Sequence, residues 1–212
     1  MPVLDLDALE RAELEHDPYE YAVVPRSFRD EATARALREE FAVDGFVRAE
    51  RGPAERGKQY LNHNRTVIDG GKPRETAPGV LSERWRLLVE DLLSDRYRAA
   101  LASLTGVGLD GCAVEARLTR YSPGCWIEPH TDRADKAVTQ LFYFNETWRD
   151  AWAGDLRVLS GPDMDDCVRR VPPLLGTSVV IVPSDRSWHA VPPVAPECPD
   201  DRRALLVHFV RP

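Results

Sequence analysis

From about Cys112 to its end, the chain consists of short β-rich segments separated by Gly, Pro, Asn and Asp. Segments of this length with turn residues between them are typical of an all-β sandwich or barrel. The preceding half favours helices, and helices followed by strands predict an α+β domain whose helices pack outside a β core. The predicted strands are 112–121, 139–145, 155–159, 168–171, 177–182, 189–191 and 202–210.

Two stretches of the N-terminal half have helical periodicity. Residues 28–41 carry apolar side chains at near-helical spacing, with acidic residues early in the segment. Residues 81–104 predict one long helix, with Ser82 as its N-cap and Gly106 as its C-terminal stop. Between them, residues 43–80 are rich in Gly, Pro and charge, and only "KQYLNHNRTVID" looks extended.

The composition is that of a soluble globular chain that needs no metal or disulfide to stabilise its fold. With 212 residues, of which 43% are hydrophobic and 30% charged, a single core can bury most of the apolar surface. The net charge of −7 argues against a nucleic-acid partner, because phosphate-binding surfaces are basic. A local cationic pocket for a small anion is still compatible with this charge.

Cysteine usage and the N-terminus indicate a cytoplasmic protein with reduced thiols. No two cysteines are spaced as CxxC, which argues against a zinc ribbon. The first residues are acidic and lack a long apolar segment, so no signal peptide is predicted, and no run is long enough to span a membrane. The four cysteines are Cys112, Cys125, Cys167 and Cys198.

His130 and Asp132 form the pattern "HTD" at the end of an extended segment. Residues i and i+2 of such a segment point the same way, so the imidazole and the carboxylate reach one point in space. A third ligand must come from another strand, and the candidates are His189, after the apolar run "TSVVIV", and His208, inside the last strand. Two His and one Asp are the facial set that binds non-haem Fe(II) and leaves positions open for a co-substrate and O2.

A cation is the next element that such a site needs. A 2-oxoglutarate co-substrate would chelate iron through its keto-acid end, and its far carboxylate would need a buried arginine or lysine, of which arginine gives the bidentate fit. Arg202 and Arg203 follow His189 by 13 and 14 residues. Their side chains are expected on opposite faces of the strand, so one can point into the barrel. An ion pair of Arg202 with Asp200 or Asp201 is the alternative.

Several short motifs of this half, in this order, resemble the Fe(II)/2-oxoglutarate-dependent dioxygenases, in particular their prolyl-4-hydroxylase-like branch. "RYSPGCWIEPHTD" is similar to the approach to the HxD pair, and "LFYFNETW" to the strand that follows. "WAGDLRVL" resembles the Gly-Gly-x-Leu-Arg strand, "VPSDRSWHAV" the segment with the distal iron ligand, and "DRRALLVHF" the strand with the co-substrate arginine. The resemblance covers about 112–210, whereas the N-terminal half matches only loosely and therefore says little about the substrate.

The resemblance implies a double-stranded β-helix, or jelly-roll, core with the N-terminal helices packed outside it. It also implies Fe(II), 2-oxoglutarate as co-substrate and O2, with ascorbate as an optional reductant. In its register Arg202 rather than Arg203 binds the co-substrate, while Tyr121 and Tyr143 could instead be core aromatics. The implied iron ligands are His130, Asp132 and His189, and the implied co-substrate residues are Arg202, Tyr121, Tyr143 and Leu156.

The expected protein is one dioxygenase domain over 1–212, with an N-terminal substrate-entrance part at 1–111 and the jelly-roll core at 112–212. The expected activity is hydroxylation of an unactivated C–H bond in a small molecule or amino-acid-type substrate, free or carrier-bound, which yields succinate and CO2. The carboxylate of Asp132 favours hydroxylation over halogenation, with desaturation or ring formation as alternatives. A prolyl or other side-chain hydroxylase acting on a protein or peptide is the second hypothesis, and a non-catalytic jelly-roll module that binds metal or sugar is the third.

Overall fold

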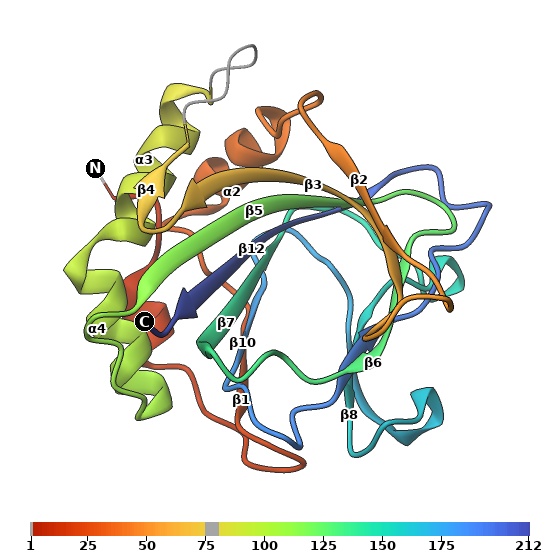
Figure 1. The fold of residues 1–212 in the computed structure, drawn as a ribbon. Helices are drawn as coiled ribbons and strands as arrows, with labels where there is room; N and C mark the ends of the chain where they lie inside the picture. Colours follow the sequence, from red (N-terminus) through yellow and green to blue (C-terminus); the bar gives the residue numbers. More distant parts are fainter. Residues whose placement is uncertain (1, 75–80) are drawn as a thin grey trace.

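The structure is a computed structural model that describes residues 2–74 and 81–212. Its strands form a single curled antiparallel sheet around a central space, and the helices cover the outer side of one wall, as Figure 1 shows. This is the jelly-roll architecture with helices outside that the sequence predicts. Among the helices of the described residues, none combines the length and the apolar character needed to cross a bilayer.

The order of strands in the sheet explains how the wall closes. The order is β1-β10-β7-β12-β5-β3-β6-β11-β8-β9, and β2 and β4 pair with β3. One end of β3 turns away from β5 to pair with β6, at Tyr60 opposite Ile127, so β3 joins the two halves of the sheet. The strands are β1 (Tyr21–Val24), β2 (Val47–Arg51), β3 (Tyr60–Asp69), β4 (Lys72–Pro73), β5 (Ala113–Tyr121), β6 (Trp126–His130), β7 (Lys136–Tyr143), β8 (Leu156–Leu159), β9 (Cys167–Val171), β10 (Ser178–Ile181), β11 (His189–Val191) and β12 (Arg202–Val210).

Of the four α-helices of the described residues, three lie in the predicted helical regions, and the helix over Leu6–Glu10 was not predicted. The predicted helix over 81–104 is divided at Ser94, whose backbone is extended and whose side chain accepts a hydrogen bond from the N–H of Tyr97. A serine that caps a new helix competes with continuation of the old one. Ser82 and Gly106 cap the two ends as predicted. The helices are α1 (Leu6–Glu10), α2 (Glu31–Glu39), α3 (Glu83–Leu93) and α4 (Asp95–Thr105), and the 3-10 turns are η1 (Asp150–Trp152) and η2 (Met164–Asp166).

Alternation along β5 and β12 separates two environments. Successive side chains of a strand point to opposite faces. On β5, Val114, Ala116 and Leu118 are buried in the core beneath the helices. The residues between them face the central space, where they line a cavity. The helical layer therefore holds the sheet from outside and leaves its inner face free for polar side chains.

The predicted strands of the C-terminal half are all present. β2 and β4 were not predicted, and β6 was expected only as the extended segment that ends at the HxD pair. All four cysteines lie in the described part of the chain and are free thiols, as predicted.

Candidate functional site

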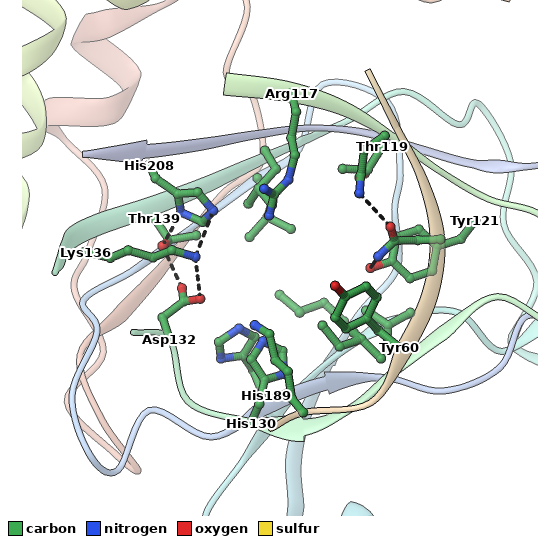
Figure 2. Close-up of a pocket in the computed structure, with 18 of the residues that line it drawn as sticks. Tyr60, Arg117, Thr119, Tyr121, His130, Asp132, Lys136, Thr139, His189 and His208 are labelled. Atoms are coloured by element: carbon green, nitrogen blue, oxygen red, sulfur yellow. Dashed lines mark hydrogen bonds and ion pairs between the residues drawn. The ribbon is translucent and has the colours of Figure 1, made fainter. Parts of the chain in front are cut away.

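A cavity of about 280 Å³ lies inside the curled sheet, between the inner faces of β3, β5, β7 and β12 and the short strands β6 and β11. Figure 2 shows its side chains converging from these strands on one central space. This volume is near the lower end of the range for small-molecule sites. The HxD pair, the downstream histidine and Arg202 all line it.

His130 and His189 are brought together by strand pairing. His130 ends β6 and His189 begins β11, and the two residues are direct partners in the antiparallel register. Their ring centroids are 4.2 Å apart. Asp132 follows β6 by two residues, and the ligand atoms of the three residues lie within 4.8 Å of one another. This group could hold one metal ion at the floor of the cavity (Figure 2).

Each histidine is fixed with one ring nitrogen left for a ligand. Nδ1 of His130 is 2.9 Å from the carbonyl oxygen of Glu128, and Nδ1 of His189 is 2.8 Å from that of Ser187. A carbonyl only accepts, so both Nδ1 atoms carry hydrogen and both Nε2 atoms keep their lone pairs. Burial lowers the pKa of both imidazoles, which favours the neutral form that a metal requires.

Asp132 is oriented by a polar cluster on β7 and β12. Its Oδ1 accepts a hydrogen bond from Nζ of Lys136 at 2.9 Å, and its Oδ2 accepts one from Oγ1 of Thr139 at 2.7 Å. His208 contacts both donors, at 3.0 Å and 2.9 Å. Burial alone would raise the pKa of Asp132, but the electrostatic influence of the nearby His189 and Lys136 and the hydrogen bond from Lys136 outweigh it, and the pKa is lowered. Asp132 is therefore an oriented anion.

His208 lies behind Asp132 and does not join the group of ligand atoms. Of the two candidates for a third ligand, the structure brings only His189 to the HxD pair. The sequence analysis missed Lys136 and Thr139. The available signal was a lysine at the head of the apolar strand "KAVTQLFY", where a buried charge needs a partner.

Arg202 is the most buried cation of the cavity wall. Its side chain is 1% exposed, and its guanidinium lies over the rings of Tyr121 and Tyr143, 5.0 Å and 5.1 Å from their centroids. Nη2 of Arg202 is 3.5 Å from the hydroxyl of Tyr143, and its Nε is buried with no hydrogen-bond partner among the described residues. Leu156, 1% exposed, lines the same cavity. A bidentate carboxylate would satisfy the buried guanidinium.

The charged residues next to Arg202 in the sequence form ion pairs with other partners. Arg203 donates to Asp200 at 2.8 Å, and Asp201 pairs with Arg120. The alternative ion pair of Arg202 with either aspartate is therefore not formed. Arg202 and Arg203 do face opposite sides of β12, as predicted.

The polar residues of β3 lie partly inside and partly outside the cavity. Asn62 and Asn64 line the cavity, and Nδ2 of Asn62 donates to the hydroxyl of Tyr121 at 3.2 Å. Arg65 instead contacts Asp44 outside the cavity. Cys125 is buried and does not belong to the metal-binding group.

Comparison with known proteins gives the site a context. Residues 116–211 match the model of the family described as the 2OG-Fe(II) oxygenase superfamily. Among curated proteins, none matches the chain. Among solved structures, a Pseudomonas putida prolyl-4-hydroxylase is 22% identical, with a TM-score of 0.59 and 97% of each chain covered.

Two other similar solved structures are a prolyl hydroxylase and an epimerase. A Trichoplax adhaerens prolyl hydroxylase in complex with a hypoxia inducible factor peptide fragment is 17% identical, with a TM-score of 0.56, 90% of this chain and 83% of that chain covered. The α-ketoglutarate-dependent epimerase SnoN from nogalamycin biosynthesis is also 17% identical, with a TM-score of 0.59, 98% of this chain and 83% of that chain covered. At these identities the likeness concerns the fold alone.

Proposed function

We propose that the protein is a hydroxylating dioxygenase of the 2OG-Fe(II) oxygenase superfamily, whose family model matches residues 116–211, and that its residues serve this reaction as follows. His130, Asp132 and His189 hold Fe(II), the two histidines through Nε2 and the aspartate through a carboxylate oxygen. The observation that carries this assignment is the convergence of their ligand atoms within 4.8 Å in a buried cavity. The donor set, two imidazoles and one carboxylate, is the set that non-haem Fe(II) oxygenases use.

Arg202 binds the far carboxylate of 2-oxoglutarate in this proposal. Its buried Nε without a partner, and its place between Tyr121 and Tyr143, support this role. The two tyrosine hydroxyls hydrogen-bond the co-substrate, and Leu156 packs on its methylene groups. Bound iron and 2-oxoglutarate supply the activation of O2, the release of succinate and CO2, and the oxidation of a substrate C–H bond.

The remaining tasks belong to the chain itself. Lys136 and Thr139 keep the carboxylate of Asp132 ionised and aimed at the histidines, and the carbonyls of Glu128 and Ser187 keep both rings in one tautomer. Residues 1–111 and 112–212 act together as one dioxygenase domain, and ascorbate serves as an external reductant.

The substrate is a small molecule or an amino-acid-type compound in this proposal. The cavity of about 280 Å³ must hold the co-substrate as well, so little room is left for a second ligand. A prolyl or other side-chain hydroxylase that acts on a peptide is the second candidate. It is favoured by β2, whose Arg51 lines the cavity and whose Val47 is 70% exposed on a strand that pairs with β3 alone among the described strands.

An anaerobic titration tests the cofactor assignment. Metal-free protein receives Fe(II) and then 2-oxoglutarate, and the visible spectrum is followed for the weak charge-transfer band of the iron chelate. We expect the band in the wild type and its loss in Asp132→Ala. If iron is bound in the wild type and no band develops, the co-substrate assignment is wrong and the metal- or sugar-binding module becomes the better hypothesis. Succinate release with candidate small molecules and peptides then separates the two substrate classes.

A further inference from the structure

The cavity is cationic although the chain carries a net charge of −7. Two acids line it, Glu115 and Asp132. Three of its cations are accounted for: Lys136 pairs with Asp132, Arg133 pairs with Asp135, and Arg202 is assigned to the co-substrate. The cations that line the cavity are Arg51, Lys58, Arg117, Arg133, Lys136 and Arg202. The charge balance therefore points to a further anion beyond 2-oxoglutarate.

Arg117 is the best placed of the remaining cations. It lies on β5, on the same face as Thr119 and Tyr121, and all three line the cavity. Figure 2 shows its guanidinium reaching from β5 into the middle of the cavity, across from His130 and His189. Its Nε is buried and has no hydrogen-bond partner, and its guanidinium takes part in no ion pair among the described residues. Arg51, by comparison, lies over the ring of Tyr60.

The position of Arg117 is electrostatically unfavourable without an anion. Burial lowers the pKa values of Lys58 and Lys136, and the charge of Arg117 adds to this effect, so Arg117 stands among like charges. A buried Nε–H without an acceptor costs free energy, because it loses its hydrogen bond to water without replacement. A bound carboxylate would supply both the missing charge and two acceptors in the geometry that a guanidinium fits.

Asn64 supplies a hydrogen-bond acceptor on β3, two positions along the strand from Thr66, the residue opposite Arg117. Thr66 is opposite Arg117 in the pairing of β3 with β5, and Asn64 is opposite Thr119. Nδ2 of Asn64 donates to Oδ1 of Asn62 at 2.8 Å, whereas Oδ1 of Asn64 is buried and receives no donor among the described residues. A substrate N–H would satisfy this oxygen. The inner face thus offers a cation and an acceptor without partners, which is the pair that an N-substituted or free amino acid needs.

We propose that Arg117 is the specificity-determining residue of this dioxygenase: it binds a carboxylate of the primary substrate, while Oδ1 of Asn64 accepts an N–H from it. This inference rests on the proposed function and narrows it, because it makes the substrate a small carboxylic acid with an N–H group, as in an amino acid or its N-acyl derivative. A phosphate is less compatible with a single guanidinium in a cavity of this size.

The experiment uses protein loaded with Mn(II) and 2-oxoglutarate, and N-acetylglycine labelled with carbon-13 in its carboxylate as the probe. Paramagnetic relaxation of the labelled carbon reports binding close to the metal. We expect saturable relaxation in the wild type, and a Kd at least about tenfold weaker in Arg117→Gln, since one charge-assisted contact is lost. N-acetylglycinamide, without the charge, and N-acetylsarcosine, without the N–H, should both bind more weakly to the wild type.

Arg133→Gln is the matched control, because it removes the same charge from the same cavity while its guanidinium is already paired with Asp135. It should bind the probe as the wild type does, and Arg117→Lys should fall between. Wild-type and Arg117→Gln proteins must both form the chelate band with Fe(II) and 2-oxoglutarate. If the band is absent from the wild type, the proposed function fails. If the band forms but the probe shows no saturable relaxation, or binds equally to Arg117→Gln, only the inference about Arg117 is overturned.

Discussion

Replacement of Arg202 by methionine tests whether this arginine binds the co-substrate or stabilises the fold. A hydrogen bond to a charged group contributes about 1.5–3 kcal/mol, and a bidentate carboxylate contact contains two of them. Arg202 is 1% exposed, so solvent screening reduces the free-energy contribution of this contact only slightly. The loss of about 3–6 kcal/mol corresponds to a Kd for 2-oxoglutarate weaker by about 10² to 10⁴. Titration of the Fe(II) protein with 2-oxoglutarate, followed by the chelate band, measures this change.

The same substitution should not destabilise the protein when 2-oxoglutarate is absent. Arg202 has no acidic partner among the described residues, and its Nε has no acceptor there. Exchange of a buried charge for an apolar side chain of similar volume is often neutral or stabilises by about 1–4 kcal/mol. The Tm of Arg202→Met should therefore equal or exceed that of the wild type. Added metal and 2-oxoglutarate should raise the Tm of the wild type much more than that of the variant.

Arg203→Met is the control, because its guanidinium lies on the other face of β12 and donates to Asp200. It should leave the affinity for 2-oxoglutarate unchanged. Two results would contradict the assignment of Arg202 to the co-substrate. Arg202→Met would bind 2-oxoglutarate as tightly as the wild type, or both variants would show the same loss of affinity for it. A fall of the Tm by several degrees in Arg202→Met alone would show that the arginine stabilises the fold and is not held for a ligand.

Three other predictions concern the support of the site and the fold. Thr139→Val removes the hydroxyl that donates to Asp132, and competitive metal titration should show Fe(II) affinity about 10- to 100-fold weaker, as for other residues that orient a metal ligand. Burial lowers the pKa of Lys58 to about 8, so near that pH a large fraction is the unprotonated amine, and a small acetylating reagent followed by peptide mass spectrometry should modify Lys58 before Lys72. Ser94→Ala removes the N-cap of α4 and should lower the free energy of unfolding by about 0.5–2 kcal/mol in urea denaturation.

The sequence predicts the β-rich half well because the strands carry strong local signals. Apolar, buried residues recur at every second position over Val114–Leu118 of β5 and Leu205–Phe209 of β12, and turn residues separate most of the short strands. β6 gives no such signal, since "WIEPH" contains a glutamate and a proline and no residue of it before His130 is fully buried. Its pairing with β11 and β3 determines it, and such pairing is a long-range property. The break of the predicted long helix was missed because apolar periodicity continues across Ser94.

Some residues of the site can likewise be predicted from the sequence, and others cannot. His130 and Asp132 are neighbours in sequence, so their pairing is visible without a structure. The cluster around Asp132 is not, because it depends on the register of β7 against β12, which puts Thr139 opposite His208. Arg117 was missed for a related reason. It shares a strand face with Tyr121, four residues away, but its lack of a partner can be known only when all neighbouring strands are placed.

The two faces of β5 explain how one strand can position both a co-substrate contact and a substrate contact in this proposal. Outward, Val114, Ala116 and Leu118 anchor the strand in the core beneath the helices. Inward, Tyr121 contacts Arg202 at the proposed co-substrate end, and Arg117 lies four residues away toward the proposed substrate end. Since the outward residues fix the register, an exchange of Arg117 should alter substrate binding while the position of Tyr121 is kept. An anion site built in this way does not require a basic protein, so the net charge of −7 is compatible with a small acidic substrate.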